Sequence, residues 1–350
     1  MAGTTHVYAG AAATMDGTRG GIFRQIAGEN HWEQLTNGIP DGAEVHAITV
    51  HPSDSDVVFI GSTKGLFRST DHGNRWERLP LPQPDADIWS VLVHPKDPRR
   101  IYAGATPIAV YRSDDGGESW KATKDPGLPN RVHMQFACRV MRLDVDPNHP
   151  DEVYATMEAN GAMHSRDGGE NWQDRTADLI RFCEEPKYRS RIGSQTEIEG
   201  MLDGHALTCS AAAPGTVFLA NRMGLFRSSD RGEHWVDMEI GRFSPLTYGR
   251  DIRTSPHDPK VLYAALSPAA RSTDGSIYRS DDVGQSWKRF DHGIKADATM
   301  MGVVAHPKDP NQVYGISRVG QVFGTRDGGK SWSENRLPEG VRDCYAIACG

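Results

Sequence analysis

The sequence is poor in cysteine, lacks long apolar runs and has no excess of positive charge. Its five cysteines are odd in number, lie far apart and form no C-x-x-C pair, so we expect reduced thiols and no disulfide framework. No run approaches the roughly 18 consecutive apolar residues of a membrane-spanning helix. The N-terminal segment has no basic start and no long apolar centre, which argues against a secretion signal. These absences predict a cytoplasmic protein that makes no membrane contact.

The charge balance limits the partners further. The net charge is −7 at pH 7, whereas a nucleic-acid-binding surface needs a concentrated basic patch. We therefore expect no nucleic-acid partner. The 37 glycines and 21 prolines indicate many turns between short elements.

What the sequence does contain is a repeat. The motif S-x-D-x-G-x-x-W recurs along the chain, first as "RSTDHGNRW" and last as "TRDGGKSW". The tryptophans that end the units are Trp32, Trp76, Trp120, Trp172, Trp235, Trp287 and Trp332. A second motif accompanies it, for example "HPKDPRRIYAGA", and apolar runs such as "VHAITV" and "VVFIG" have the length of single strands. Four strands in about 40 to 50 residues are typical of one β-propeller blade.

The two chain ends predict how the ring closes. The N-terminal "THVYAG" matches the second strand of a unit, and the C-terminal "DCYAIACG" matches a first strand such as "EVHAITV". Six full units and one shared unit make seven blades, and sharing leaves no open sheet edge at the ends. We predict an all-β fold over residues 1–350: a single seven-bladed propeller with four-stranded antiparallel blades, one of them shared by both termini.

The repeated motif has turn chemistry. Ser and Asp can accept hydrogen bonds from the amides of their own turn, Gly allows a positive φ, and Trp anchors the next strand between blades. The copies resemble the Asp-box (BNR) motif of the sialidase-like propeller superfamily. Together with "HPxDPxxVYAG" they are most similar to photosystem II assembly-factor propellers and xyloglucan-cleaving tandem propellers. The first unit, "RQIAGENHW", lacks both Ser and Asp.

The last copy also fits a phosphate loop. Residues 324–331, "GTRDGGKS", match G-x-x-x-x-G-K-S, a motif that needs a strand before it and a helix N-terminus after it. The other copies of the repeated motif align with this segment, and Trp332 is expected to begin a strand. We therefore predict a turn without nucleotide binding, and no cofactor.

The resemblance implies that the repeated turns and the ligand site lie on opposite faces. In a four-stranded blade the second-to-third loops and the interblade loops share the other face, where the sequences diverge and function is expected. Aligning the innermost strands gives one inward position per blade: His46, Trp89, Met141, Thr208, Arg250, Met301 and Tyr345. Two residues earlier, on the same strand face, stand Glu44, Asp87, Arg139, Ala206, Tyr248, Thr299 and Asp343.

This ring predicts a polar funnel with an acidic and aromatic sector. The candidate acid–base residues are Glu44, His46, Asp87, Asp343 and Tyr345, because clustered carboxylates beside an imidazole can shift one another's pKa. The candidate substrate-binding residues are Trp89, Arg139, Tyr248, Arg250, His133, His205 and Arg222. Trp89 can stack on a ring, and Arg139 and Arg250, expected across the funnel, can hold a carboxylate or phosphate. The alternative is a wet channel whose charges only pair with one another.

The longest insertion covers residues 176–205 and is expected on the functional face. Thr176 is expected to cap a short helix with Leu179, Phe182 and Cys183 on one side. The insertion is interpreted as a lid, a docking arm for a protein partner or a solvated loop. Shorter loops carry Lys64, Glu158, Asn160, Arg222 and Arg318, which are expected to be exposed.

Metal ligands are weakly indicated. His133, Cys138, Cys183, His205 and Cys209 fall near one sector, but no local pair has ligand spacing, so no metal is predicted. His51, His94 and His306 precede prolines and are interpreted as turn residues.

Two functions remain open. The first is a hydrolase- or lyase-like, glycosidase-like enzyme acting on a small polar or anionic substrate, including a sugar derivative. Similarity to sialidases would imply an arginine triad, an acid and a tyrosine nucleophile, but only "IFRQI" approaches their motif. The related xyloglucan enzymes build their cleft from two propellers. The second function is a non-catalytic assembly scaffold, as similarity to the photosystem assembly factors implies.

Overall fold

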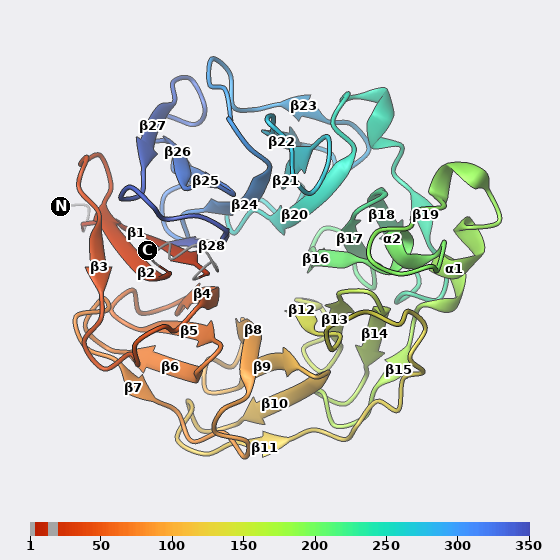
Figure 1. The fold of residues 1–350 in the computed structure, drawn as a ribbon, viewed down its shortest axis with the longest axis horizontal. Helices are drawn as coiled ribbons and strands as arrows, with labels where there is room; N and C mark the ends of the chain where they lie inside the picture. Colours follow the sequence, from red (N-terminus) through yellow and green to blue (C-terminus); the bar gives the residue numbers. More distant parts are fainter. Residues whose placement is uncertain (1–3, 13–19) are drawn as a thin grey trace.

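The computed structural model describes residues 4–12 and 20–350, and these residues form seven four-stranded antiparallel sheets. The sheets stand around a central axis as the blades of a propeller (Figure 1). The predicted all-β, seven-bladed fold is confirmed. No helix in the described part of the chain is long and apolar enough to cross a membrane.

We number the blades 1 to 7 in chain order and give their strands from the axis outward. Blade 1 contains β28 (Cys344–Cys349), β1 (His6–Ala11), β2 (Gly21–Ile26) and β3 (Glu33–Leu35). Blade 2 contains β4 (Val45–Val50), β5 (Val58–Ser62), β6 (Gly65–Ser69) and β7 (Glu77–Arg78). Blade 3 contains β8 (Asp87–Val93), β9 (Ile101–Thr106), β10 (Ala109–Ser113) and β11 (Lys121–Ala122). Blade 4 contains β12 (Val140–Val145), β13 (Val153–Met157), β14 (Gly161–Ser165) and β15 (Gln173–Asp174).

Blade 5 contains β16 (Gly204–Cys209), β17 (Val217–Asn221), β18 (Gly224–Ser228) and β19 (Val236–Asp237). Blade 6 contains β20 (Tyr248–Thr254), β21 (Leu262–Ser267), β22 (Ser276–Ser280) and β23 (Lys288–Arg289). Blade 7 contains β24 (Met300–Ala305), β25 (Val313–Ser317), β26 (Gln321–Thr325) and β27 (Ser333–Arg336). The helical elements are α1 (Ala177–Phe182), η1 (Pro186–Tyr188), α2 (Glu199–Leu202) and η2 (Ile240–Arg242).

The ring closes through blade 1 as predicted. Strand β28, from the C-terminus, pairs antiparallel with β1, from the N-terminus, in the register Val7↔Cys349 and Ala9↔Ile347. The backbone N–H of His6 donates to the carbonyl of Gly350 at 2.8 Å. The two chain ends therefore supply neighbouring strands of one blade and remove an edge that would otherwise lack partners.

The core lies between neighbouring blades. One buried cluster, for example, joins Phe59 and Leu66 of blade 2 to Ile88 and Ile101 of blade 3. The second strand of a blade is covered on both faces, which is why its sequence is continuously apolar and does not alternate. Blades approach closely at Gly61, where a Cβ would lie 2.6 Å from Ile88 Cγ2 and 2.8 Å from its carbonyl oxygen. A small residue is required there by the packing.

The S-x-D-x-G-x-x-W segments form hairpin turns between third and fourth strands. In blade 3, Ser113 Oγ accepts the N–H of Gly117 at 2.9 Å, and Asp115 accepts the N–H of Ser119 at 2.9 Å. The segment that resembles a phosphate loop makes the same turn, since Asp327 accepts the N–H of Ser331 at 2.9 Å. Strand β27 follows it where a nucleotide site would need a helix. The predicted turn is confirmed.

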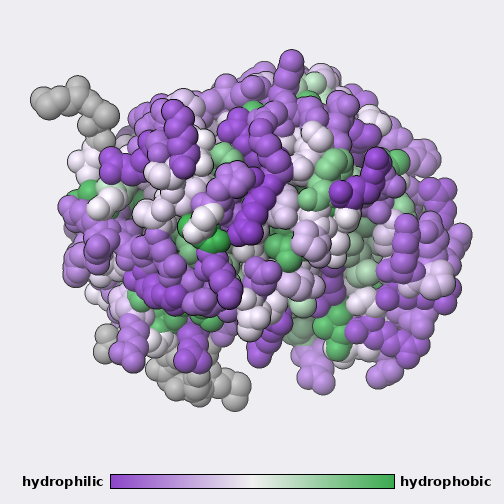
Figure 2. Space-filling model, turned by 90° about the horizontal axis from the view of Figure 1, so that it is seen from above, coloured by the Kyte–Doolittle hydropathy of each residue, from purple (hydrophilic) through white to green (hydrophobic). Residues whose placement is uncertain are grey.

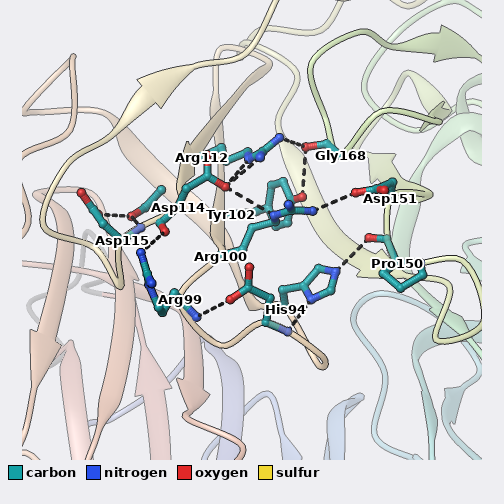
Figure 3. A network of polar contacts seen from close by, with 12 residues as sticks. His94, Arg99, Arg100, Tyr102, Arg112, Asp114, Asp115, Pro150, Asp151 and Gly168 are labelled. Atoms are coloured by element: carbon teal, nitrogen blue, oxygen red, sulfur yellow. Dashed lines mark hydrogen bonds and ion pairs between the residues drawn. The ribbon is translucent and has the colours of Figure 1, made fainter.

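The "HP" residues join one blade to the next. His94 Nδ1 accepts the N–H groups of Lys96 and Asp97, which leaves Nε2 to donate to the carbonyl of Pro150 in blade 4 at 2.8 Å (Figure 3). The interpretation of His94 as a turn residue is confirmed. Figure 2 shows that hydrophilic residues dominate the side of the propeller seen there, with small separate apolar areas.

Candidate functional site

Each innermost strand carries a β-bulge near its start. The register shifts identify one extra residue per blade, namely Tyr345, His46, Trp89, Met141, His205, Arg250 and Met301 in blades 1 to 7. Bulges re-aim side chains and are common beside functional sites. All seven bulge residues line one cavity at the axis. Its volume of about 40 Å³ has room for a few waters or one small chemical group.

The predicted ring was wrong in blade 5. The structure places His205 at the bulge, and therefore Asp203 two residues earlier, where Thr208 and Ala206 were expected. The turn of this blade starts at Ser210, whose hydroxyl donates to the carbonyl of Pro259 as His94 does to Pro150. In the sequence, Ala213–Pro214 matches the "HP" marker better than Ser210 does, because Ser210 is not followed by a proline as His51, His94 and His306 are. The inward ring residues predicted in the other six blades are confirmed as the bulge residues.

The acidic and aromatic sector exists as a connected group. His46 Nδ1 lies 3.1 Å from Asp87 Oδ1, and its Nε2 lies 3.4 Å from Glu44 Oε2. The His46 ring stacks on Trp89 at 3.7 Å and meets Tyr345 edge-on at 5.5 Å. Trp89 Nε1 donates to Asp87 at 2.9 Å.

The charges in this sector favour an ion pair. Burial disfavours the imidazolium of His46, but hydrogen bonds to Asp87 and Glu44 outweigh burial and raise its pKa. Burial likewise opposes ionisation of Asp87, and hydrogen bonds from His46 and Trp89 outweigh it, so the pKa of Asp87 is lowered. Asp87 is thus held as a carboxylate. The catalytic roles of these residues stay predictions.

A second polar group lies in blades 5 and 6. Asp203 Oδ2 accepts from Arg222 Nε at 3.0 Å and lies 3.3 Å from His205 Nε2. His205 Nδ1 donates to the carbonyl of Gly249 at 2.7 Å, and its Nε2 lies 3.3 Å from the Tyr248 hydroxyl. Burial opposes the charge of Asp203, but His205 and Arg222 lower its pKa. Burial raises the pKa of Tyr248 to about 12, so it is a neutral hydroxyl donor.

Arg139 and Glu158 connect the two groups. Arg139 was expected across the funnel from the acidic sector, but its guanidinium lies 4.0 Å above the Trp89 ring, because blades 3 and 4 are neighbours. Glu158 Oε2 is 2.6 Å from Arg139 Nε. Burial and the charge of Asp203 raise the pKa of Glu158. Glu158 was expected to be exposed, yet only 25% of its side chain is.

Arg250 differs from the other basic residues of the funnel. It is 8% exposed and lines the central cavity. Among the described residues its guanidinium makes no hydrogen bond or ion pair, whereas Arg142 and Arg253 below it both pair with Asp251 at 3.2 and 3.1 Å. Arg142, Asp251 and Arg253 also line the cavity. The sequence alignment predicts Arg250 but not these three residues, because they do not occupy the aligned ring positions.

The remaining predicted residues are placed less centrally. Asp343 accepts from Arg318 at 2.7 Å, so its carboxylate is already paired. His133 is exposed and lies 3.3 Å from Asn130. Lys64 is exposed as expected, but Asn160, Arg222 and Arg318 are not, which corrects that expectation.

The insertion is a packed part of the fold. Helix α1 begins at Ala177 as expected, and Leu179 and Cys183 are buried in the core between blades 4 and 5. Thr176 makes no side-chain cap; its hydroxyl bonds to the carbonyls of Asn160 and Ala162. Both ends of the insertion are therefore packed, whereas most of residues 184–195 are exposed. Its C-terminal end brings Asp203 and His205 to the funnel.

Side chains able to bind a metal lie close together in another part of the molecule. The set His133, Cys138, Cys183, His205 and Cys209 is not brought together. Within the described residues the one cluster of suitable spacing is Asp146, His149 and Glu152, on the face of the repeated turns. All five cysteines are free.

A ring of seven four-stranded blades with repeated turns on one face and a polar funnel on the other defines a seven-bladed β-propeller of the sialidase-like type. A family model described as sortilin, neurotensin receptor 3 (Sortilin-Vps10) matches residues 64–199 and 275–346, more than half of the chain. The chain belongs to this family. The predicted superfamily resemblance is confirmed.

Similar proteins extend the comparison. A xyloglucanase of Hypocrea jecorina is 23% identical over 288 residues, which cover 73% of this chain and 33% of the relative. The GH74 xyloglucanase structure from Xanthomonas campestris has a TM-score of 0.66 at 17% identity, covering 98% of this chain and 52% of that chain. YCF48 bound to D1 peptide has a TM-score of 0.56 at 14% identity, covering 92% and 88%. The chain spans about a third or less of the curated xyloglucanases, and the solved structures show the fold alone.

Proposed function

We propose that this chain is a glycosidase-like hydrolase or lyase that binds a small anionic, sugar-derived substrate in the funnel. The observation that carries the proposal is Arg250, a buried cation that faces the cavity and has no partner among the described residues. A buried charge without a partner is costly, so a ligand anion would be stabilised there. A cavity of about 40 Å³ suits a carboxylate, with the rest of the ligand above it.

The acid–base pair of this proposal is Glu158 and Asp87. Their surroundings shift their pKa values in opposite directions, up for Glu158 and down for Asp87. Such a pair supplies one protonated acid and one ionised base at the same pH. Both side chains keep about a quarter of their surface exposed, at 25% and 27%. They lie on neighbouring blades with Arg139 and Trp89 between them.

The residues would act together as follows. Arg250 binds the carboxylate, and Trp89 supplies an apolar face for the sugar ring. In hydrolysis, Glu158 donates its proton to the leaving oxygen and Asp87 takes a proton from the water that adds to the sugar carbon. In elimination, Asp87 takes a proton from the carbon beside the carboxylate instead. The pair His46–Glu44 keeps Asp87 ionised, and Tyr248 remains a hydrogen-bond donor.

A second function is favoured by a groove on the same face. Loop 125–138 lines a cavity of about 320 Å³ with Leu128, Met134 and Phe136, and Phe136 is 37% exposed. The solved structure of YCF48 carries a bound peptide. An assembly module would use this apolar groove for a peptide and would not need Glu158.

Three further expectations from the sequence also stay proposals. A cytoplasmic location rests on the number and spacing of the cysteines. The lack of a nucleic-acid partner rests on the net charge of −7. Docking of a protein partner on the insertion at 176–205 is the third, and exposed Ile192 at 43% is its apolar candidate contact.

The test is a substrate panel assayed on four proteins. Aryl uronides, matched neutral aryl glycosides and a neutral xyloglucan oligosaccharide are offered to the wild type, Glu158→Gln, Arg250→Gln and the control Arg227→Gln on strand β18. We expect turnover of uronides only, a loss of about 10²–10⁴-fold in Glu158→Gln, and a KM increase in Arg250→Gln that Arg227→Gln does not share. The rate should fall as the pH rises through the raised pKa of Glu158.

Two results would contradict the proposal. One is equal turnover of neutral and acidic sugars, which would remove the role of Arg250. The other is no turnover or binding of any sugar, together with enrichment of displayed peptides that Phe136→Asp abolishes and Glu158→Gln leaves unchanged. That outcome would establish the second function.

A further inference from the structure

The junction between blades 4 and 5 departs from the repeat on the face opposite the funnel. Figure 3 shows the preceding junction, between blades 3 and 4. There Arg112 and Tyr102 donate to the carbonyl of Gly168 at 2.8 and 3.0 Å, and Arg100 pairs with Asp151 at 2.9 Å. Arginine side chains of one blade thus hold the turn of the next.

One blade further, acidic and imidazole groups occupy the equivalent positions. Glu152 precedes β13 as Arg100 precedes β9, and His164 is the penultimate residue of β14 as Arg112 is of β10. Asp146 stands at the position of His94, and Arg231 at the position of Gly168. Comparison of the two junctions therefore shows that potential metal ligands of blade 4 replace the basic residues found at the equivalent positions of blade 3.

These groups lie close together. Asp146 Oδ2 is 3.1 Å from His149 Nδ1, and the ligand atoms of Asp146, His149 and Glu152 all lie within 4.8 Å of one another. Asp146 also accepts the N–H of Gly215 from blade 5 at 2.8 Å. The turn that holds the cluster is thus connected to the next blade.

His164 supplies an independent indication of a missing partner. Its side chain is 0% exposed, neither ring nitrogen has a hydrogen-bond partner, and Nε2 points at Glu152 Oε2 from 3.7 Å. The ring stacks on Tyr154 at 4.4 Å. Buried polar atoms without partners are rare and costly. An imidazole nitrogen without a hydrogen-bond partner is available as a metal ligand.

We propose that this junction binds a divalent transition-metal ion of the Zn²⁺ class, with Asp146, His149 and Glu152 as ligands and His164 completing the set from inside the blade. Two carboxylates and two imidazoles form a nitrogen and oxygen donor set that suits Zn²⁺ and its neighbours. Arg231 pairs with Glu152 at 2.7 Å and competes with the ion. Its side chain is 37% exposed, so it can turn outward into solvent when the ion binds.

The test uses untagged protein comprising residues 1–350, stripped with a chelator and titrated with ZnCl₂ against a chromophoric competitor. His149→Ala and Glu152→Gln remove one ligand each, and His149 is exposed enough to be replaced without disturbing the core. His234→Ala is the matched control, because it removes an exposed imidazole 2.7 Å from Asp230 outside the cluster. Arg231→Gln removes the competitor.

We expect one ion per chain, affinity lowered at least about tenfold in His149→Ala and Glu152→Gln, no change in His234→Ala, and tighter binding in Arg231→Gln. Co²⁺ should give visible absorption bands that His149→Ala changes. Binding that all four variants leave unchanged would show an adventitious ion, and it would overturn the proposal, as would the absence of binding. Sugar turnover is unaffected by either outcome, because the cluster and the funnel lie on opposite faces.

Discussion

At the scale of single residues, the buried imidazole of His46 gives the propeller a measurable pH dependence. Its pKa is raised above the usual 6.5 by Asp87 and Glu44. The folded protein therefore keeps a proton that the unfolded chain releases, and this stabilisation is full below pH 6.5 and is lost as the pH rises through the raised value. We expect the free energy of unfolding to fall by up to about 1.4 kcal/mol per pH unit in that window, and His46→Gln to remove this slope.

The control at this scale is His234→Ala, measured by urea denaturation over the same pH range. His234 also has a carboxylate partner, Asp230, but it is exposed, and exposed ion pairs contribute little. Parallel curves for the wild type and His46→Gln would contradict the prediction.

His46 was found from sequence because the strand around it repeats in the other blades. His205, its equivalent in blade 5, was misplaced because Ser210 lacks the proline that follows the marker position in blades 2, 3, 4, 6 and 7.

At the scale of elements, the repeated turn should depend on its serine. Ser113 is 1% exposed, and its hydroxyl donates to Asp115 at 2.8 Å and accepts the N–H groups of Asp115 and Gly117. Ser113→Ala leaves the buried N–H of Gly117 without a partner, which costs about 1–3 kcal/mol. Urea denaturation with an unchanged m-value should show this loss. Ser119→Ala, which removes an exposed hydroxyl from the same turn, should stay within about 0.5 kcal/mol; equal losses would contradict the assigned role.

The turns and strands were predictable because each copy of the repeat confirms the others. The insertion at 176–205 occurs once, and no second copy shows which of its side chains are buried. Thr176 is of a residue type that caps helices, but its hydroxyl bonds to the carbonyls of Asn160 and Ala162 instead. Glu158 likewise lies in a loop, and its carboxylate pairs with Arg139, which precedes β12. Long-range contacts of this kind leave no local pattern in the sequence.

At the scale of the whole molecule, stability depends on blade 1, where strands from both ends of the chain pair. Ile347, Cys344 and Cys349 of β28 belong to the core shared by blades 7 and 1. Truncation after Asp343 removes this strand and exposes the edge of β1. We expect a loss of more than about 4 kcal/mol or association through the exposed edge, visible as a lower melting temperature and an earlier elution in gel filtration.

A circular permutant separates strand pairing from the position of the chain ends. Linking Gly350 to Thr4 by a short flexible linker converts β28 and β1 into a continuous hairpin, since His6 and Gly350 already exchange backbone hydrogen bonds. New ends between Asp41 and Gly42 fall in an exposed turn. The permutant keeps every strand, so it should elute as the wild type does and melt within a few degrees of it, while the truncated chain does not. A truncated chain that stays monomeric with an unchanged melting temperature would show that the ring does not need β28, and that the inward side chain of Tyr345 is dispensable for holding the funnel together.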